Sequence, residues 1–181
     1  VGTKLSMASL ALFTVILGGF IVTSSVMSSR LIEQKVEASV QESAKLLAGL
    51  IDSADRDLRS RVQVFAKGFR KGLQGSIQIK PEMQIDIQGK KTPALLVGEQ
   101  PVNLNFGIVD SFTEITGAVA TVFVKSGDDF IRVTTSVKNE KGERAVGTTL
   151  DHTNPAYAAI QSGKSFTGLA KLFGRQYMTY Y

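Results

Sequence analysis

The side chains best suited to chemistry in this 181-residue chain lie along one strand-like segment, residues 130–138. Successive residues of a strand face opposite sides of a sheet, so Arg132, Thr134 and Ser136 are expected to share one face. The apolar residues between them are expected to face a core. A guanidinium beside two hydroxyl groups is a set that suits a carboxylate, because it offers a planar fork of donors.

The preceding segment, residues 118–125, is rich in β-branched residues and apolar on nearly both faces, which predicts a buried central strand. An arginine on the paired strand needs an acidic partner or an anionic ligand, because an isolated buried charge is costly. The residues alone leave both alternatives open, a structural salt bridge and a ligand site. Polar residues of two later strands could converge on the same cavity. The predicted ligand-binding set is Arg132, Thr134, Ser136, Lys171, Tyr177 and Tyr180.

Residue types that many enzymes require are scarce. The chain has no cysteine and one histidine, His152. This excludes a disulfide framework, a thiolate zinc site and a cysteine nucleophile, and it leaves little scope for a histidine-rich metal site. Asp151, beside His152, has no nucleophile at a suitable spacing and is expected to be a cap or turn residue. We therefore expect no catalytic residue, no metal site, no cofactor and no enzyme activity.

Nucleotide and nucleic-acid binding have little support. The chain has no P-loop, dinucleotide-binding or metalloprotease motif. The formal net charge is +5, but the basic residues are interleaved with acidic ones. A dispersed charge of this kind does not predict a nucleic-acid interface.

The elements that must position the site begin with a segment of almost no charge, residues 1–29. The uncharged run Leu5–Ser29 lies between Lys4 and Arg30. As a helix it would measure about 37 Å, enough to cross a hydrocarbon core of about 30 Å. A secretory signal peptide is the alternative, but its apolar region is shorter. We expect a retained transmembrane helix with a short cytoplasmic start and the remainder outside the cytoplasm.

Residues 30–75 have a helical pattern. Apolar residues or alanines recur at spacings of three and four from Val36 to Leu73, which predicts one long helix with a single apolar stripe. A stripe of this length has to pack on a partner copy, on a sheet, or on both. Continuous with a membrane span, the helix is expected to act as a lever or dimer stalk.

The pattern changes to a period of two in residues 76–181, which predicts an antiparallel sheet with short helical insertions. Asp110 or Ser111 can cap a short helix that ends at Gly117, and Ser111 with Glu114 fits a capping box. Asn154-Pro155 opens a second short helix. The last two strands form a hairpin around Gly174-Arg175. The fold class is α+β, with a long helix packed on a sheet.

Two segments resemble a known family. They are VDSFTEITG, Val109–Gly117, and the run that begins GAVATVFVKSGDDFIRVTTSVK and ends at Tyr181. Both are similar to the extracytoplasmic Cache-type sensor domain of bacterial methyl-accepting chemotaxis proteins, and more narrowly to the Cache3/Cache2 fusion type. The chain, which starts at Val1 and stops inside a strand-like run, is interpreted as an N-terminal fragment of such a receptor.

The resemblance implies a PAS-like antiparallel sheet with the long helix on one side, a ligand pocket on the other, and C-terminal strands beyond Tyr181. It implies a receptor in the inner (cytoplasmic) membrane, as a homodimer, whose sensor domain lies in the periplasm or outside the cell. A small ligand, expected to be an organic acid, would displace the helix and signal to cytoplasmic partners through the missing C-terminal region.

Proteins with other functions share these sequence features. A sensor histidine kinase or a diguanylate cyclase could have this input domain, and the sequence after Tyr181 would distinguish them. A membrane-anchored hydrolase is disfavoured by the lack of cysteine and of paired acids at a defined spacing. A purely structural stalk is disfavoured by the polar face of the strand at residues 130–138.

Overall fold

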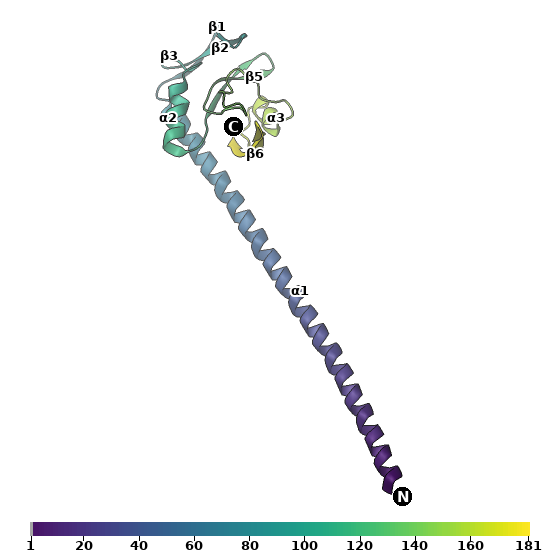
Figure 1. The fold of residues 1–181 in the computed structure, drawn as a ribbon. Coiled ribbons are helices and arrows are strands. Elements are labelled where there is room, and N and C mark those ends of the chain that lie inside the picture. The colour runs from purple at the N-terminus through teal and green to yellow at the C-terminus, as the bar shows by residue number, and fades with distance from the viewer. Residues whose placement is uncertain (1) are drawn as a thin grey trace. The chain divides into compact units, whose positions relative to one another are not determined.

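A computed structural model describes the backbone of residues 2–181 and the side chains of residues 13–25, 27 and 34–181. The side chains of Lys4 and Arg30, which close the predicted membrane span, lie outside the described residues. The elements are α1 (Gly2–Gly72), β1 (Ile77–Ile87), β2 (Lys90–Val97), β3 (Gln100–Pro101), α2 (Phe106–Thr116), β4 (Thr121–Ser126), β5 (Asp129–Thr135), α3 (Pro155–Gln161), β6 (Thr167–Leu172) and β7 (Arg175–Tyr180), as Figure 1 shows.

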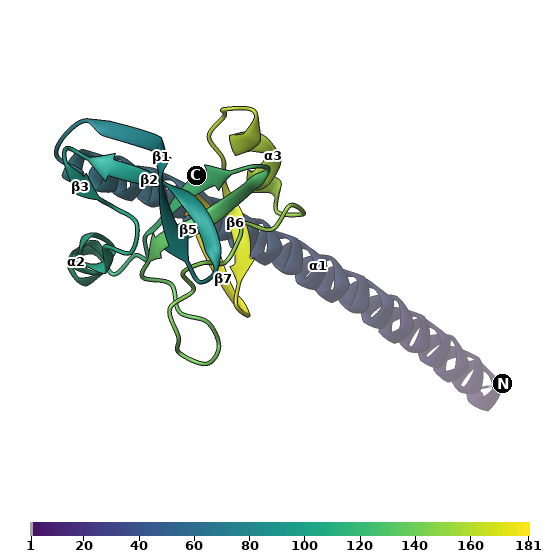
Figure 2. The same cartoon turned by 90° about the horizontal axis from the view of Figure 1, so that it is seen from above.

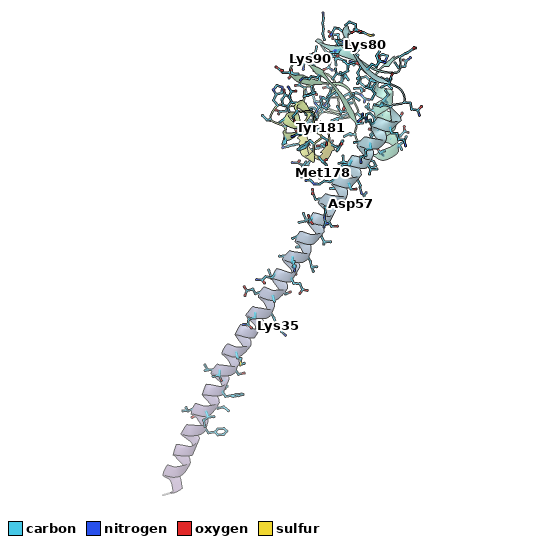
Figure 3. The ribbon with its side chains drawn as sticks, turned by 180° about the vertical axis from the view of Figure 1, so that it is seen from behind. Lys35, Asp57, Lys80, Lys90, Met178 and Tyr181 are labelled. Carbon is cyan, nitrogen blue, oxygen red and sulfur yellow. The ribbon has the colours of Figure 1, made fainter. Side chains whose placement is uncertain are left out.

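The chain divides into two compact units, residues up to Ala54 and Asp55–Tyr181, and each is described by itself. Residues 2–54 of the first unit are helical, so the predicted passage of the helix beyond Arg30 without a break is confirmed. Its described side chains are exposed, including Val36, Val40 and Leu47 of the apolar stripe. Lys35, labelled in Figure 3, projects from the same stretch of helix.

No helix is both long and apolar enough to cross a membrane among the residues that were described. The predicted span Leu5–Ser29 lies partly outside those residues, because the side chains of 5–12, 26, 28 and 29 are not described. The transmembrane helix stays a prediction.

The second unit, Asp55–Tyr181, contains the end of α1, two short helices and three antiparallel sheets. The strand orders are β1-β2-β3, β4-β5 and β6-β7. The α+β class is confirmed, whereas the single sheet expected from the sequence is not formed among the described strands. Figure 2 shows α3 leading into the β6–β7 hairpin at one side of this unit.

Two of the hairpins close through the same kind of turn. Register partners Ile87 and Lys90 flank Gln88-Gly89, and Leu172 and Arg175 flank Phe173-Gly174. All four central residues have positive φ, between 46° and 83°. This is the requirement of a type I′ turn, which suits the twist of antiparallel strands. The expected hairpin is therefore confirmed, with its turn one residue earlier than predicted.

A β-bulge changes the pattern of β5. Val122 pairs with Thr134, but the next residue, Phe123, pairs with Arg132, so Val133 is an extra residue on β5. Directly opposed residues of antiparallel strands point to the same face. Arg132 therefore shares a face with Phe123, while Thr134 shares the opposite face with Val122. The expected common face of Arg132 and Thr134 is wrong, because alternation does not survive a bulge.

The predicted helix before Gly117 begins earlier than its capping box indicates. α2 starts at Phe106, and Asn105 occupies the N-cap position without a side-chain cap hydrogen bond. The capping box at Ser111 is wrong, because Ser111 lies in the middle of the helix. The end at Gly117 is confirmed, since this residue has φ of 72° and its N–H bonds to the carbonyl of Thr113. The Asn154-capped helix α3 is also confirmed, with Pro155 in its first turn.

The core beneath the β1–β2 hairpin contains one buried polar network. The Asn103 side chain is 6% exposed. Its oxygen accepts from the Leu95 N–H at 2.8 Å, and its amide donates to Thr92 Oγ1 at 3.2 Å and the Pro93 carbonyl at 3.1 Å. Burial of polar groups is tolerated here because each one has a partner.

We predict that Asn103→Ala lowers the free energy of unfolding by about 1–3 kcal/mol, because the buried Leu95 N–H loses its acceptor. Chemical denaturation of the complete chain measures this. Gln84→Ala, which removes an exposed amide bonded to the Pro81 carbonyl, is the control and should stay within about 0.5 kcal/mol of the parent. Equal effects of the two variants would contradict the prediction.

Arg144 follows a turn but is only partly exposed. It forms a bidentate pair with Asp110 of α2, at 2.7 and 3.0 Å, and donates to the Thr135 carbonyl. Its guanidinium carbon lies 4.5 Å from the centre of the Phe106 ring. The pair ties α2 to the loop after β5. The Arg144 hydrogen bond lowers the pKa of Asp110 below its ordinary value of 3.8.

We predict that Asp110→Asn makes stability less dependent on pH in acid. A carboxyl whose pKa is lowered by folding stabilises the fold above its unfolded pKa, near 4, and loses this contribution as the pH falls through the folded pKa. Unfolding midpoints of the parent and variant should therefore converge as the pH is lowered from about 5 to about 2. Glu99→Gln, at an exposed position, is the control. A constant difference between parent and Asp110→Asn would contradict the prediction.

Candidate ligand-binding site

Arg132 on β5 is the buried charge of the second unit. The residue is buried, with 4% of its surface exposed. Its Nη1 donates to Thr148 Oγ1 at 2.6 Å and, at 3.4 Å, to the Thr149 carbonyl. Its Nε is buried and has no hydrogen-bond partner. Among the buried side-chain polar atoms of the described residues, this Nε alone lacks a hydrogen-bond partner. A buried donor without an acceptor carries the full free-energy cost of desolvation.

Two aromatic rings contact the Arg132 guanidinium. Its carbon lies 4.9 Å from the centre of the Phe123 ring and 5.7 Å from that of Phe173. Rings stack on the flat face of a guanidinium, and its N–H groups point outward in the plane. The rings therefore do not compete for the N–H groups of Arg132.

The structural salt bridge, one of the two alternatives left open by the sequence, has no partner among the described residues. The ion pairs found there involve Arg59, Arg61, Arg144 and His152, and none includes Arg132. Burial lowers the pKa of Arg132, with the nearby Tyr181 opposing the change. Burial also raises the pKa of the Tyr181 hydroxyl. Both directions reflect the burial of the two groups in a poorly solvated place, which disfavours the charged form of each.

Arg132 lines two cavities. The first, which we call the Arg–Lys cavity, has a volume of about 340 Å³. It lies between β5, β6 and the loop before α3, and Lys171, Asp151, Asn154 and Phe173 contribute to its walls. Two cations and one carboxylate give these walls a net positive charge. A small anion is the ligand that this balance favours.

The second, the aromatic cavity, has a volume of about 440 Å³ and is lined by α1, α2, β4, β5 and β7. Phe65 and Phe69 of α1 form its helical wall, and the Phe112 ring of α2 meets them edge to face at 6.4 and 5.0 Å. Met178 of β7 and Tyr181, which follows that strand, also line it, and both are labelled in Figure 3. Arg132 is therefore shared between a polar cavity and an apolar one that adjoins α1.

The structure brings only part of the predicted set together. Lys171 joins Arg132 in the Arg–Lys cavity, and Tyr180 joins it in the aromatic cavity. Ser136 and Tyr177 line a third cavity of about 520 Å³, which does not include Arg132. The Ser136 hydroxyl also bonds to Thr113 of α2 at 2.7 Å.

Thr134 lines none of these three cavities. It is fully buried on the other face of β5, where its hydroxyl donates to the Asn105 carbonyl at 2.9 Å. Its role here is to fix the chain just before α2.

Sequence reasoning missed four residues around Arg132, which are Phe123, Thr148, Phe173 and Tyr181. Phe123 could have been found from the hairpin, because it is the residue paired with Arg132 once the bulge is placed. Phe173 and Thr148 lie in turns and loops, where no periodic pattern marks their direction. Only the tertiary structure brings them to the guanidinium.

Asp151 and His152, which lie just before α3, form contacts that stabilise their loop. Asp151 accepts from the N–H and hydroxyl of Thr153, both at 2.8 Å, so its predicted role as a turn residue is confirmed. His152 pairs with Asp129 at 2.9 Å and stacks on Tyr157, with ring centres 4.1 Å apart. The Tyr157 hydroxyl donates to the Asp128 carbonyl. No group of three or more potential metal ligands occurs among the described residues.

The Cache 3/Cache 2 fusion domain matches residues 25–181 of this chain. The chain belongs to the Cache 3/Cache 2 fusion domain family. Cache domains are extracytoplasmic domains that sense small molecules. The comparison with curated proteins found no match, and that with solved structures found none either.

We predict that Arg132→Met raises the thermal stability of the ligand-free chain, by about 1 kcal/mol in the free energy of unfolding. A thioether side chain fills similar space without a buried charge or an unsatisfied Nε. Thermal unfolding of the complete chain in detergent measures the change. A loss of stability would show instead that the Thr148 and aromatic contacts make the arginine a structural residue.

Proposed function

We propose that this Cache domain is the input region of a membrane chemoreceptor that binds a small organic acid at Arg132. The observation that carries the proposal is the buried guanidinium with an unpaired Nε and no carboxylate partner among the described residues. A carboxylate ligand would supply the missing charge and accept from the free edge of the guanidinium. Charge-assisted hydrogen bonds of this kind are the strong ones.

Lys171 supports a carboxylate as the ligand. It is exposed on β6 and lines the Arg–Lys cavity together with the buried arginine. A flexible ammonium can follow ligands of different length, whereas Arg132 offers a fixed planar fork. Arg132 would therefore set the class of ligand, and Lys171 would increase its affinity.

The same geometry supports a route from ligand to helix. Arg59 of α1 donates to the carbonyl of Thr167, the first residue of β6, at 2.9 Å, and Gln63 reaches the Thr167 hydroxyl at 3.3 Å. The other end of β6 forms part of the Arg–Lys cavity. The β6–β7 ladder would carry a displacement at the cavity to α1. A ligand shifts such an equilibrium only by its differential affinity for the two states.

The membrane part of the proposal rests on the sequence. Leu5–Ser29 would be the span, Lys4 its cytoplasmic flank, and α1 the connection to a sensor domain in the periplasm or outside the cell. The exposed apolar stripe of α1 would pair with a second copy, so that the receptor is a homodimer. Cytoplasmic partners would receive the signal.

Calorimetry with acetate, propionate and succinate tests the ligand assignment. We predict that Arg132→Ala weakens carboxylate binding about 10- to 100-fold, because a charge-assisted hydrogen bond is lost. Arg175→Ala, which removes an exposed arginine outside the Arg–Lys cavity, is the matched control and should bind as the parent does. Undiminished binding by Arg132→Ala would exclude this site.

For the coupling, we predict that Arg59→Ala binds the carboxylate normally but abolishes the swimming response of cells to it. Arg61→Ala is the control, because Arg61 pairs with Asp57 just as Arg59 pairs with Asp55, both over one helical turn. A capillary chemotaxis assay with the gene replaced by each variant measures the response. An unchanged response in Arg59→Ala cells would contradict this route, and an unchanged response on deletion of the gene would contradict a chemotaxis role.

A further inference from the structure

The turn between β6 and β7 holds a bulky side chain in an unfavourable backbone conformation. Phe173 has φ of 46°, in the left-handed region, and Gly174 follows with φ of 79°. The first position of such a two-residue turn favours asparagine, aspartate or glycine. A non-glycine residue in this region is unfavourable, and such outliers concentrate at functional sites.

The strained turn sets the direction of the Phe173 ring. Phe173 is partly buried, lines the Arg–Lys cavity, and lies 5.7 Å from the guanidinium carbon of Arg132. The register pair Leu172–Arg175 fixes the turn to the end of a regular ladder, so the ring has little freedom to swing away. Asparagine at this position would suit the turn better, but it would leave the guanidinium without this aromatic contact.

We infer that Phe173 is a positioning residue of the anion site, which stacks on Arg132 and holds its hydrogen-bonding edge toward the Arg–Lys cavity. The anion in this inference rests on the proposed function. The contact between Phe173 and Arg132 is independent of it. A ring over the flat face of Arg132 excludes water from the cation without competing for its N–H groups. The electrostatic attraction of a carboxylate is stronger where water is excluded.

The chain provides a matched control in the other hairpin. Gln88-Gly89 joins β1 to β2 through the same kind of turn, and Gln88 has φ of 52°. Gln88 lines none of the three cavities around the site. Gln88→Asn and Phe173→Asn therefore make the same backbone improvement, and only the second removes the ring from Arg132. Phe173→Leu keeps the apolar bulk and the strain but removes the aromatic face.

The experiment measures thermal unfolding, carboxylate affinity and the Arg132 Nε–H resonance for the complete chain in detergent. Both asparagine variants should unfold about 2 °C higher than the parent, because both relieve the turn. Affinity for acetate, propionate or succinate should fall about fivefold to tenfold in Phe173→Asn and Phe173→Leu, and should stay unchanged in Gln88→Asn. Stability and affinity would thus change in opposite directions at Phe173 alone.

The Nε–H resonance, assigned by its loss in Arg132→Lys, tests the contact without any ligand. Ring currents should displace it in the parent and in Gln88→Asn, and both Phe173 variants should move it toward the other arginines. A resonance that does not respond to Phe173→Leu would overturn the inference, as would unchanged carboxylate affinity in both Phe173 variants. If the parent binds none of the three carboxylates, the proposed ligand class fails, and the resonance alone decides the role of Phe173.

Discussion

The burial of one positive charge without a carboxylate partner is the constraint on which the site depends. Arg132 is desolvated on β5, its Nε is unsatisfied, and its remaining contacts are a hydroxyl, a distant carbonyl and two rings. Each of these neighbours is weaker than an ion pair. The fold therefore contains a local cost that a bound anion would offset, and this is the physical reason to place a sensor site here.

The rest of the second unit holds that arginine in place from several directions. The bulge at Val133 turns Arg132 toward the face of Phe123, the strained turn presents Phe173, and the loop before α3 supplies Thr148. On the far side, the Asp110–Arg144 pair fixes α2 to the same loop region. The Arg59 contact with β6 gives the assembly a direct connection to α1. Under the proposed function, ligand chemistry and signal transmission would thus depend on the same small ladder of strands.

Prediction from sequence succeeded where one local pattern dominates and failed where partners from distant segments decide. The continuous helix, the α3 cap at Asn154 and the hairpin at Gly174 all follow from short-range rules of periodicity, capping and turn preference. The start of α2 was wrong because Phe106, Ile108 and Val109, which precede Ser111, pack in the interior as part of the helix, and a capping box carries no information on that packing. No local pattern indicates the partner of Arg144, because Asp110 lies 34 residues away in the chain.

The sequence by itself determined the fold class, the long helix and the identity of the central cation, because composition and period are properties of neighbouring residues. It also indicated the Cache resemblance, which the family match over residues 25–181 supports. Only the tertiary structure decided which residues surround that cation. One inserted residue on β5 moved Thr134 to the opposite face, and a turn and a loop brought Phe173 and Thr148 in. Register and loop closure depend on long-range packing, and no local pattern encodes them.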